Sequence, residues 1–434
     1  MTTSQRSLET KPSARSEAAS HKPPVTVVGG GMITRTQLLP TLYHMQREGH
    51  LGEIHICALD SGPLREIQEC PQLRRAFPGQ SFTAHPDPAR FSPDQKFPQL
   101  YQEVLAAAPR GSVAVIAVPD QFHYDALKAA LANDLHVCVV KPMVLKYAQA
   151  VELERMAYER GLVIGVEYHK RFDTRNLMAR QAYREGRLGE FRLAQAQMIE
   201  PWYYRYSNFQ NWCICENSDM FTYVGCHYVD LVAFITGLRP VAVSVYGIVD
   251  EYPNGNKGFL WTDGRVIWEN GACLSVVDAI GYPNAAAGSN AQGLTMWCQG
   301  PDDAALLVHS DQYRGVKTSY TTAGSDPGDT IYCEPNPDYF QYVYQGGEGL
   351  APTGYGHRSA EHIVRACIRA GAIADLAERQ RYLKQLDADG IMATPANSSY
   401  NELVIEASRL SILNGGREVV IQYGDAPGVA FRQY

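Results

Sequence analysis

Nearly continuous apolar runs alternate with helical patterns along the first part of the chain. Strands that are buried on both faces of a parallel sheet have this unbroken apolar character. Their alternation with helices is typical of a doubly wound α/β domain. The runs occupy residues 24–31, 53–60, 112–119, 136–142 and 162–168, and the helices between them are expected at 36–48, 98–108, 124–133 and 148–160. We therefore predict a Rossmann-type dinucleotide-binding domain over residues 23–170.

The pattern changes after residue 170. A helix at 172–185 and a strand at 191–199 lead to an aromatic, polar stretch, and a helix at 221–235 follows. The next strands have no helices between them, and turn sequences at 269–271 and 300–303 join them as hairpins. Residues 171–434 are therefore predicted to form an α+β domain with a large, mostly antiparallel sheet.

Composition and charge narrow the class of protein. The 434 residues suit two domains, and the net charge of −7 without a basic stripe argues against nucleic acid or a membrane surface as partner. No apolar run reaches the ~18 residues needed to span a bilayer. Residues 1–22 are polar and are interpreted as a disordered tail rather than a secretory signal.

The ten cysteines are scattered, and several lie in apolar strands. This distribution favours reduced thiols and a cytoplasmic location over a disulfide framework. A zinc site is the alternative for one cluster, whose members are Cys213, Cys215, Cys226 and His227. The C-x-C spacing is unusual for structural zinc, so we expect no metal.

A glycine-rich loop follows the first strand. Gly29 and Gly31 fit the first two glycines of a G-x-G-x-x-G loop, and Met32 and Ile33 lead into the helix. Such a loop places a pyrophosphate at a helix N-terminus, although three glycines can also form an ordinary turn. Asp60, at the end of the second strand, could accept hydrogen bonds from ribose hydroxyls and favours NAD over NADP.

Several motifs together resemble one known family. The stretch from 113 to 142 carries the family's proline, histidine and lysine at matching positions, which are Pro119, His123, His136, Lys141 and Pro142. Further matches are the segments at 165–173 and 225–230 and the closing helix and strand, so the resemblance extends from about residue 25 to 421. The chain thus resembles the glucose–fructose oxidoreductase, inositol dehydrogenase and rhizopine-catabolism (Gfo/Idh/MocA) family.

This sequence also departs from the family pattern. The glutamate of the family's E-K-P motif is Val140 here, and the third loop glycine is Thr34. The first aspartate of the family's D-x-G-x-H motif is Tyr223. Residues 202–212 form an unusually long aromatic segment. The change to Val140 removes an acid that could tune Lys141. The change to Thr34 predicts either a slightly wider fit between helix and strand or an altered helix start.

The resemblance implies that Lys141 and His227 carry the chemistry. It also implies that Pro119, His123 and Lys141 contact the cofactor. A lysine at the carboxyl edge of a parallel sheet can stabilise a developing alkoxide. Histidine suits a general base because its ordinary pKa lies near neutral pH. Tyr223 precedes His227 by four residues and is expected on the same helix face, where its phenol could bind the substrate hydroxyl or relay its proton. Asp230 could orient the histidine and is also a candidate for substrate binding. The competing interpretation of His227 is a satisfied core histidine.

Other side chains are candidates for substrate binding. His169, Lys170 and Arg171 follow the last strand of the first domain, although Arg171 could instead form a structural ion pair. Trp202 could stack on a sugar ring with the aromatic residues near it, or the segment could be a packed insertion or an oligomer contact. His357 and Arg358 begin a late helix and are weaker candidates.

The sequence as a whole predicts an NAD-dependent oxidoreductase acting on a hydroxyl or keto group of a sugar, glycoside or cyclitol. Two alternatives remain: an NAD-retaining enzyme that cleaves glycosides through transient oxidation, and a non-catalytic ligand sensor on the same fold. We expect a homodimer or homotetramer formed through the C-terminal sheet, since exposed sheet faces are usually covered.

Overall fold

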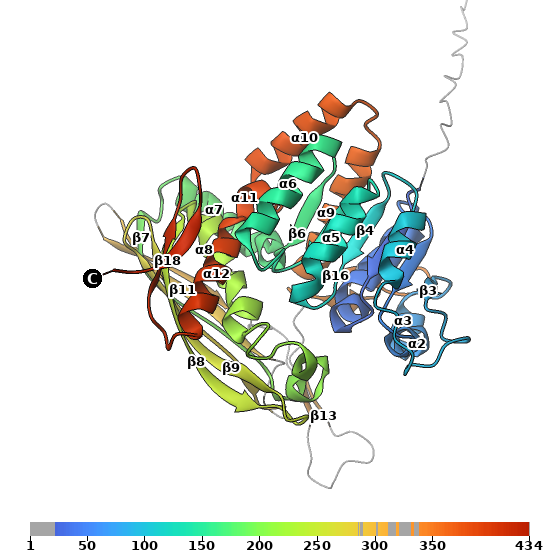
Figure 1. Cartoon of the computed structure of the whole chain (residues 1–434), viewed down its shortest axis with the longest axis horizontal. Helices are drawn as coiled ribbons and strands as arrows, with labels where there is room; N and C mark the ends of the chain where they lie inside the picture. Colours follow the sequence, from blue (N-terminus) through green and yellow to red (C-terminus); the bar gives the residue numbers. More distant parts are fainter. Residues whose placement is uncertain are drawn as a thin grey trace, which may run out of the picture.

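The computed structural model describes residues 22–284, 286, 290–300, 303–310, 318–320, 331–333 and 338–433, with 318–320 and 331–333 as backbone only. Figure 1 shows two parts, a parallel sheet with helices on both faces and a larger sheet beside it. Apart from Lys22, the predicted tail lies outside the described residues. No helix in the described ranges is long and apolar enough to cross a bilayer.

The first sheet is parallel throughout, with the order β3-β2-β1-β4-β5-β6. This is the strand order of a doubly wound dinucleotide-binding domain, as predicted. The short, partly exposed edge strand β3 carries too weak an apolar pattern to be recognised from sequence. The strands are β1 (Val25–Val28), β2 (Ile54–Cys57), β3 (Thr83–His85), β4 (Val113–Ile116), β5 (His136–Val140) and β6 (Ile164–Glu167).

Helices cover both faces of this sheet. On one face α4, α5 and α6 contact one another in turn, and on the other α1 contacts α9. Their bounds are α1 (Leu39–Arg47), α2 (Gly62–Glu69), α3 (Pro71–Ala76), α4 (Leu100–Ala107), α5 (His123–Ala132), α6 (Tyr147–Arg160) and α9 (Tyr355–Gly371). Three single-turn segments accompany them: η1 (Thr34–Leu38), η2 (Asp120–Phe122) and η3 (His169–Phe172).

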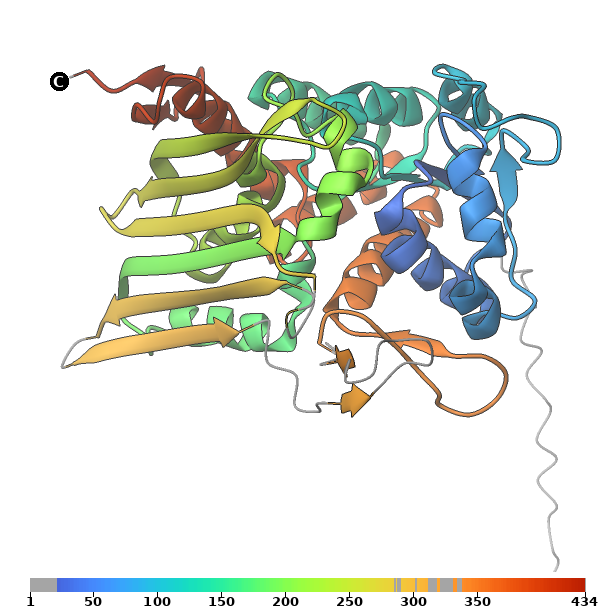
Figure 2. The ribbon, with the colours of Figure 1, turned by 90° about the horizontal axis from the view of Figure 1, so that it is seen from below.

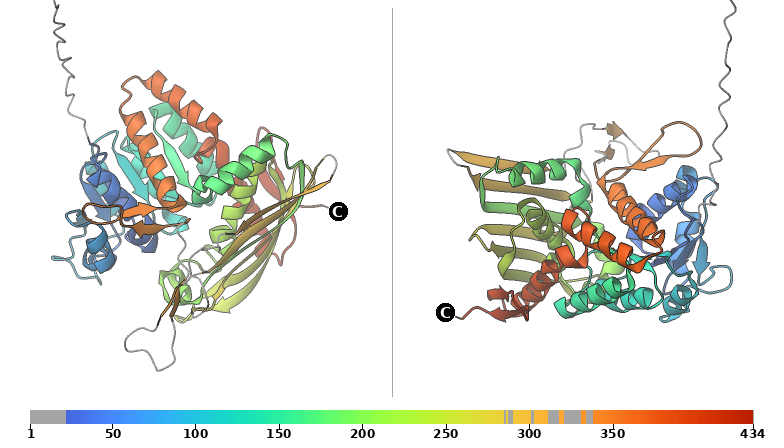
Figure 3. Two further views of the ribbon diagram at one scale, coloured as in Figure 1. Left: turned by 180° about the vertical axis from the view of Figure 1, so that it is seen from behind. Right: turned by 90° about the horizontal axis from the view of Figure 1, so that it is seen from above.

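Helix α9 belongs to the first domain by its packing. It contacts β4, β5 and β6, and α10 (Leu376–Asp389) contacts α6. Ala393 also forms a backbone bridge to Val166 of β6, just before α11 (Pro395–Ser398). Figure 3 shows α9 and α10, in orange, against the N-terminal domain. The division of the chain at residue 170 assigned these late helices to the second domain, and their contacts correct it.

The second sheet has the order β12-β11-β7-β10-β9-β8-β17-β18 (Figure 2). Its pairs are antiparallel except β7–β10, which is parallel. The mostly antiparallel sheet was therefore predicted correctly. Its strands are β7 (Glu190–Pro201), β8 (Pro240–Glu251), β9 (Lys257–Trp268), β10 (Cys273–Tyr282), β11 (Ala291–Gln299), β12 (Ala304–Ser310), β17 (Val419–Gln422) and β18 (Gly428–Phe431).

Two small sheets pair β13 (Thr318–Tyr320) with β14 (Ile331–Cys333) and β15 (Gln341–Val343) with β16 (Ala351–Thr353). One face of the large sheet is buried under α7 (Thr174–Arg184), α8 (Cys226–Thr236) and α12 (Tyr400–Ile412). Because side chains alternate along a strand, the inward residues of β7 form core while Leu193 remains exposed. Helix α8, which carries His227, therefore lies on the inner face of this sheet.

Candidate functional site

The loop after β1 has one glycine that the fold needs and one that faces open space. Gly29 has φ +115°, and a Cβ there would lie 2.0 Å from the carbonyl oxygen of Ala117 at the end of β4. A Cβ on Gly31 would meet no atom within 4 Å. The loop thus packs tightly on the sheet at Gly29 and leaves room at Gly31 for a ligand to approach the backbone.

Thr34 changes the start of the following helix. The side chain is buried, and its hydroxyl donates a 2.6 Å hydrogen bond to the carbonyl oxygen of Gly29. It also begins the π-helical segment η1 (Thr34–Leu38). The altered helix start, one of the two outcomes expected from the missing third glycine, is therefore present. Met32 and Ile33 are helical residues directly before the π-helical segment.

Asp60 follows β2 and has two partners. One carboxylate oxygen accepts the Gly62 backbone N–H at 2.9 Å, and the other lies 2.6 Å from Nζ of Lys96. Lys96 was not a sequence candidate, since it is 36 residues away. Arg65 donates to the carbonyl oxygen of Pro88 at 2.7 Å and does not pair with Asp60. The acid expected at the ribose end therefore stands beside an ammonium group.

His123 joins the loops that follow β4 and β5. Its ring is fully buried, and its two nitrogens lie 2.8 Å and 2.7 Å from the carbonyl oxygens of Val118 and Pro142. Both polar atoms are therefore occupied by backbone, which corrects the expectation that His123 contacts the cofactor. It instead fixes the Pro119 loop against the segment that carries Lys141, whose peptide bond to Pro142 is cis.

Lys141 reaches from the end of β5 to the helix before α8. Its side chain is mostly buried, with residue exposure of 9%. Its ammonium nitrogen lies 3.7 Å from the ring centroid of Tyr223 and donates a hydrogen bond to the backbone carbonyl of the same residue. Tyr223 belongs to η6 (Phe221–Gly225), which runs directly into α8. The fold thus brings together two of the predicted catalytic side chains.

His227 lies on the first turn of α8 and is only 2% exposed. Its Nδ1 atom is buried, and no hydrogen-bond partner is found for it among the described residues. Burial lowers the pKa of His227 well below its usual value, and the nearby charges of Lys141, His169 and Lys170 lower it further. Burial, first, and the neighbouring positive charges, second, therefore favour the neutral imidazole.

A buried polar chain ends at His227. The His169 ring lies 4.5 Å from the His227 ring between centroids, and its Nδ1 lies 3.2 Å from a carboxylate oxygen of Glu167. The other oxygen of Glu167 accepts the Gln37 amide at 2.8 Å, and Gln37 accepts the Tyr339 hydroxyl at 2.5 Å. Besides His227 itself, only His169 in this chain of contacts was a sequence candidate. The apolar run of β6 ends in an acid at Glu167, which is the signal that could have indicated it.

Buried carboxyl groups surround Lys141. Burial raises the pKa of Asp120, Glu200 and Asp278, and the charge of Lys141 acts against this rise at each of them. Asp120 also accepts a 3.1 Å hydrogen bond from Ser218. The family acid missing at Val140 is therefore replaced by acids from other elements. Asp120 follows a buried strand by only a few residues and could have been suspected from that position.

Arg171 and Asp230 form a buried ion pair rather than lining the cleft. Two guanidinium nitrogens lie 2.8 Å and 2.6 Å from the two carboxylate oxygens of Asp230. Tyr400 and Asn401 also donate to Asp230, at 3.0 Å and 3.1 Å. These bonds saturate the acid, so the expectations that Asp230 orients His227 and that both residues bind substrate are wrong. The structural ion pair considered for Arg171 is the arrangement found.

His357 is likewise not in the site. Its ring nitrogens lie 3.1 Å from the Thr41 hydroxyl and 3.4 Å from the Glu361 carboxylate, and its ring packs edge-on against His44. These contacts place it in the interface between α9 and α1. The glycines before α9 therefore indicated a turn, and His357 packs between α9 and α1.

The aromatic segment divides into a packed part and an exposed part. The packed rings approach Tyr223, which lies 4.9 Å from Phe209 and 5.3 Å from Trp212 between centroids. Trp202 is 38% exposed, and the Arg205 guanidinium lies 3.8 Å from its ring centroid. The segment consists of η4 (Trp202–Tyr206) and η5 (Asn208–Asn211). It therefore builds one wall beside Tyr223 and presents an aromatic ring at the surface.

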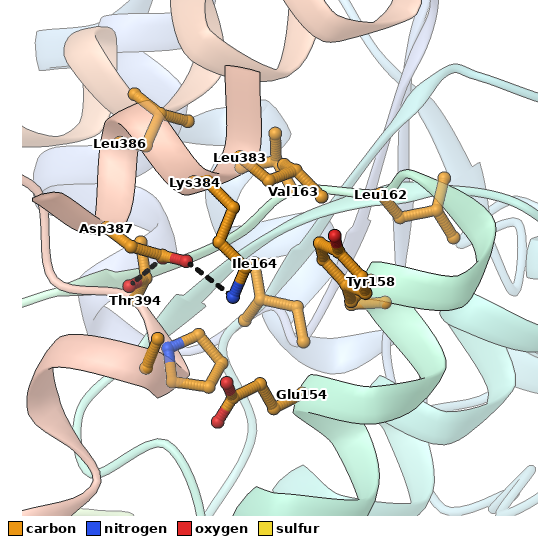
Figure 4. A pocket seen from close by; sticks show the side chains of 13 residues that line it. Glu154, Tyr158, Leu162, Val163, Ile164, Leu383, Lys384, Leu386, Asp387 and Thr394 are labelled. Carbon is orange, nitrogen blue, oxygen red and sulfur yellow. Dashed lines mark hydrogen bonds and ion pairs between the residues drawn. The ribbon is translucent and has the colours of Figure 1, made fainter. Parts of the chain in front are cut away.

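Two further features lie outside this arrangement. Within the described ranges no group of three or more His, Cys, Asp or Glu residues is placed to hold a metal ion, so the cysteine cluster near His227 does not form the zinc site considered. A cavity of about 40 Å³ between α6 and α10 (Figure 4) contains none of the site residues above. Its lining includes Glu154, Tyr158 and Lys384, and it is too small for a dinucleotide.

Comparison with known proteins identifies the family. The family described as "Oxidoreductase family, NAD-binding Rossmann fold" matches residues 24–168, and the GFO/IDH/MocA C-terminal domain matches residues 176–272. The two matches together cover more than half of the chain. The chain belongs to the GFO/IDH/MocA oxidoreductase family. The resemblance inferred from the motifs is thereby confirmed, as is the NAD-binding character of the first domain.

Sequence relatives within the GFO/IDH/MocA family match over short segments. An uncharacterized oxidoreductase of Schizosaccharomyces pombe is 36% identical over 86 residues, which cover 20% of this chain and 23% of the relative. A UDP-N-acetylglucosamine 3-dehydrogenase of Acidithiobacillus ferrooxidans is 25% identical over 146 residues, which cover 34% of this chain and 42% of that protein. The chain thus aligns with less than half the length of these relatives.

Solved structures match over nearly the whole chain. An inositol dehydrogenase homolog from Azotobacter vinelandii, complexed with NADH and myo-inositol, is 19% identical with a TM-score of 0.60, covering 92% of this chain and 97% of that one. The scyllo-inositol dehydrogenase of Lactobacillus casei, with NAD(H) and scyllo-inositol, is 15% identical with a TM-score of 0.56, covering 92% and 99%. At these identities the likeness establishes the two-domain fold.

Proposed function

We propose that this GFO/IDH/MocA member is an NAD-dependent oxidoreductase that transfers hydride between the cofactor and a hydroxyl carbon of a sugar, glycoside or cyclitol. The observation that carries the proposal is the contact of Lys141, at the carboxyl edge of the parallel sheet, with Tyr223, which lies one helical turn before His227. Ligands of doubly wound domains bind at this edge. The likeness in fold to a structure holding NADH and myo-inositol agrees with it.

The residues at this edge fit NAD. The open space at Gly31 suits close approach of a pyrophosphate to the backbone, and Asp60 stands where ribose hydroxyls are bound in this fold. When bound, NAD supplies the hydride acceptor or donor. In the family's fold the remaining chemistry, binding the reacting oxygen and moving its proton, falls to side chains of the chain itself.

Lys141 and His227 divide that work. The Lys141 ammonium would donate a hydrogen bond to the reacting oxygen and stabilise the negative charge that develops as the C–H bond breaks. His227 is neutral because of its burial and its cationic neighbours, so it can accept the hydroxyl proton during oxidation. In reduction the same groups would return the proton to the new hydroxyl.

Glu167 and His169 would act as positioning residues. The carboxylate of Glu167 holds the His169 ring by its Nδ1 atom, and that ring lies against His227. A packed imidazole limits the rotation of its neighbour, and restricted geometry at a base raises its efficiency. These two residues provide a support for His227 in a chain whose family aspartate is replaced by Tyr223.

The surroundings of Lys141 suit a hydroxyl-rich substrate. Asp120 and Glu200 are buried carboxyl groups whose pKa values the charge of Lys141 lowers against the larger effect of burial. Carboxyl oxygens accept hydrogen bonds from hydroxyls, and an exposed indole such as Trp202 can stack on a sugar ring. The proposed substrate class rests on this mixture of oxygen acceptors and an aromatic face.

Turnover of Lys141→Ala tests the proposal directly. The wild-type protein should form NADH steadily on at least one member of a panel of sugars and cyclitols. The Lys141→Ala variant should lose at least a hundredfold in kcat while still binding NAD, because only the charge at the reacting oxygen is removed. Lys146→Ala is a matched control, since that side chain is 61% exposed and pairs with Glu406.

Unchanged turnover in Lys141→Ala would refute the role of this lysine. Product release without NADH formation would favour the NAD-retaining glycoside-cleaving reaction instead. Absence of both signals across the panel, with NAD still bound, would favour a ligand sensor.

We also propose that the outer face of the large sheet is covered by a second copy of the chain. Leu193 and Leu306 flank Trp297 in register on neighbouring strands, and all three are exposed. Contiguous exposed apolar surface marks association sites. Light scattering should give a dimer or tetramer for wild-type protein and a smaller species for Trp297→Glu. A monomeric wild-type protein would contradict this.

A further inference from the structure

A second cavity lies at the C-terminal end of α8. Its volume is about 240 Å³, several times that of the cavity in Figure 4. Four arginines from three segments line it, two of them from α7, together with aromatic and small residues. The arginines are Arg171, Arg180, Arg184 and Arg239. Among the described residues, no aspartate or glutamate lines this cavity.

Two of the four charges have a carboxylate partner and two do not. Arg171 pairs with Asp230, and Arg239 lies 3.3 Å from a carboxylate oxygen of Glu269. Arg180 and Arg184 instead donate to backbone carbonyls at the C-terminal ends of α10 and α8, and neither has a carboxylate partner among the described residues. Their acceptors are Asp389 for Arg180, at 3.3 Å, and Phe234 and Ile235 for Arg184, at 3.3 Å and 3.0 Å.

Arg180 has a buried hydrogen-bond donor that is not satisfied within the described residues. Its Nε atom is buried, and no partner for it is found in the described part of the chain. Its guanidinium lies 5.1 Å from the Phe234 ring centroid, and that of Arg171 lies 5.4 Å from the same ring. Burial and the charges of Arg184 and Arg171 lower the pKa of Arg180. The positive charges of these arginines repel one another, and an anion bound between them would offset this repulsion.

The chemistry of the lining selects the kind of anion. Guanidinium groups bind phosphate and carboxylate through paired N–H donors, and arginine is the preferred residue for such bidentate contacts. A water molecule occupies roughly 30 Å³ in the liquid, so this cavity could hold a phosphate group with part of an attached molecule. A divalent phosphate would pair with Arg180 and Arg184, the two lining arginines without a carboxylate partner in the described part of the chain.

We propose that this arginine-lined cavity is a binding site for a phosphate group, carried either by inorganic phosphate or by a small phosphate ester. The site is separate from the Lys141–His227 centre and does not depend on the proposed function. Arg171, which lines the cavity, pairs with Asp230 of helix α8, the helix that carries His227 three residues earlier.

Calorimetric titration of the full-length protein with inorganic phosphate, and separately with glycerol phosphate, tests the site at constant ionic strength. Wild-type protein should show saturable binding, and Arg180→Gln should weaken it at least tenfold. Arg184→Gln serves as a second variant if the first fails to fold. Arg155→Gln is the matched control, because that arginine is 66% exposed on α6 and pairs with Glu159.

The variants also separate this cavity from the glycine loop, which could bind phosphate too. Binding that is unchanged in both Arg180→Gln and Arg184→Gln, or absent from wild-type protein, would overturn the proposal. Much tighter binding of the ester than of inorganic phosphate identifies an ester as the ligand. Equal affinity identifies phosphate itself, and loss of binding in the Arg155→Gln control would show a nonspecific charge effect and reject the site.

Discussion

Replacing single glycines in the loop after β1 should separate folding from cofactor binding. Alanine at Gly31 meets no atom within 4 Å, and the residue is outside the left-handed region, so the fold should tolerate it to within about 1 kcal/mol. Alanine at Gly29 places a Cβ 2.0 Å from the Ala117 carbonyl oxygen at φ +115°. Strained backbone and overpacking each cost roughly 1–3 kcal/mol, so Gly29→Ala should lose about 2 kcal/mol or more.

Gly31→Ala, which should leave the stability of the fold nearly unchanged, should instead weaken the binding of NAD. A methyl group at Gly31 would hold the pyrophosphate away from the backbone N–H groups at the helix start. Hydrogen bonds to charged groups contribute roughly 1.5–3 kcal/mol each, so the loss of one should weaken NAD binding roughly tenfold to a hundredfold. Gly31→Ala should therefore fold normally and bind NAD poorly.

Urea denaturation and calorimetric titration with NAD would measure both quantities on both variants. Wild-type NAD affinity in Gly31→Ala would refute the assignment of the open space to the cofactor. A wild-type denaturation midpoint in Gly29→Ala would refute the close packing of the loop on β4. Gly79→Ala, at a loop position with φ +86° and nothing nearby, controls for backbone strain alone.

Two further predictions concern buried charge. Asp230→Asn leaves the buried Arg171 guanidinium without its counterion, and the free energy of unfolding should fall by about 3–5 kcal/mol in urea titrations; an unchanged midpoint would contradict the pairing. The lowered pKa of His227 keeps the base form populated as the pH falls through 6.5, so kcat/KM for oxidation should decline only below that pH. An acid limb centred at or above 6.5 would show that burial and neighbouring cations do not control this histidine.

The sequence by itself determined the elements and their order in the first domain. Unbroken apolar runs separated by helices specify a parallel sheet covered on both faces, because a strand buried on both sides cannot alternate. The glycines after β1 and the lysine after β5 are local signals at known sheet positions. Through family resemblance, Lys141 and His227 were also predicted to lie in one site. In the structure Lys141 contacts Tyr223, which lies one helical turn before His227.

The tertiary structure decided which partners each charged side chain has. Arg171 and Asp230 are 59 residues apart, and nothing in either local pattern indicates that they pair. His123 had the right position for a cofactor contact, but two backbone carbonyls occupy its ring nitrogens. Glu167 had no assigned role until the fold brought it against His169.

The same division holds for the packing of whole elements. The helical pattern of α9 predicts a helix with one apolar face, yet it does not say which sheet that face covers. The parallel pairing of β7 with β10 likewise depends on where the chain returns after α8. Periodicity is set by neighbours a few residues away and can be read from a single chain. Sheet pairing, ion pairs and burial depend on residues far apart in sequence, and only their meeting in space determines them.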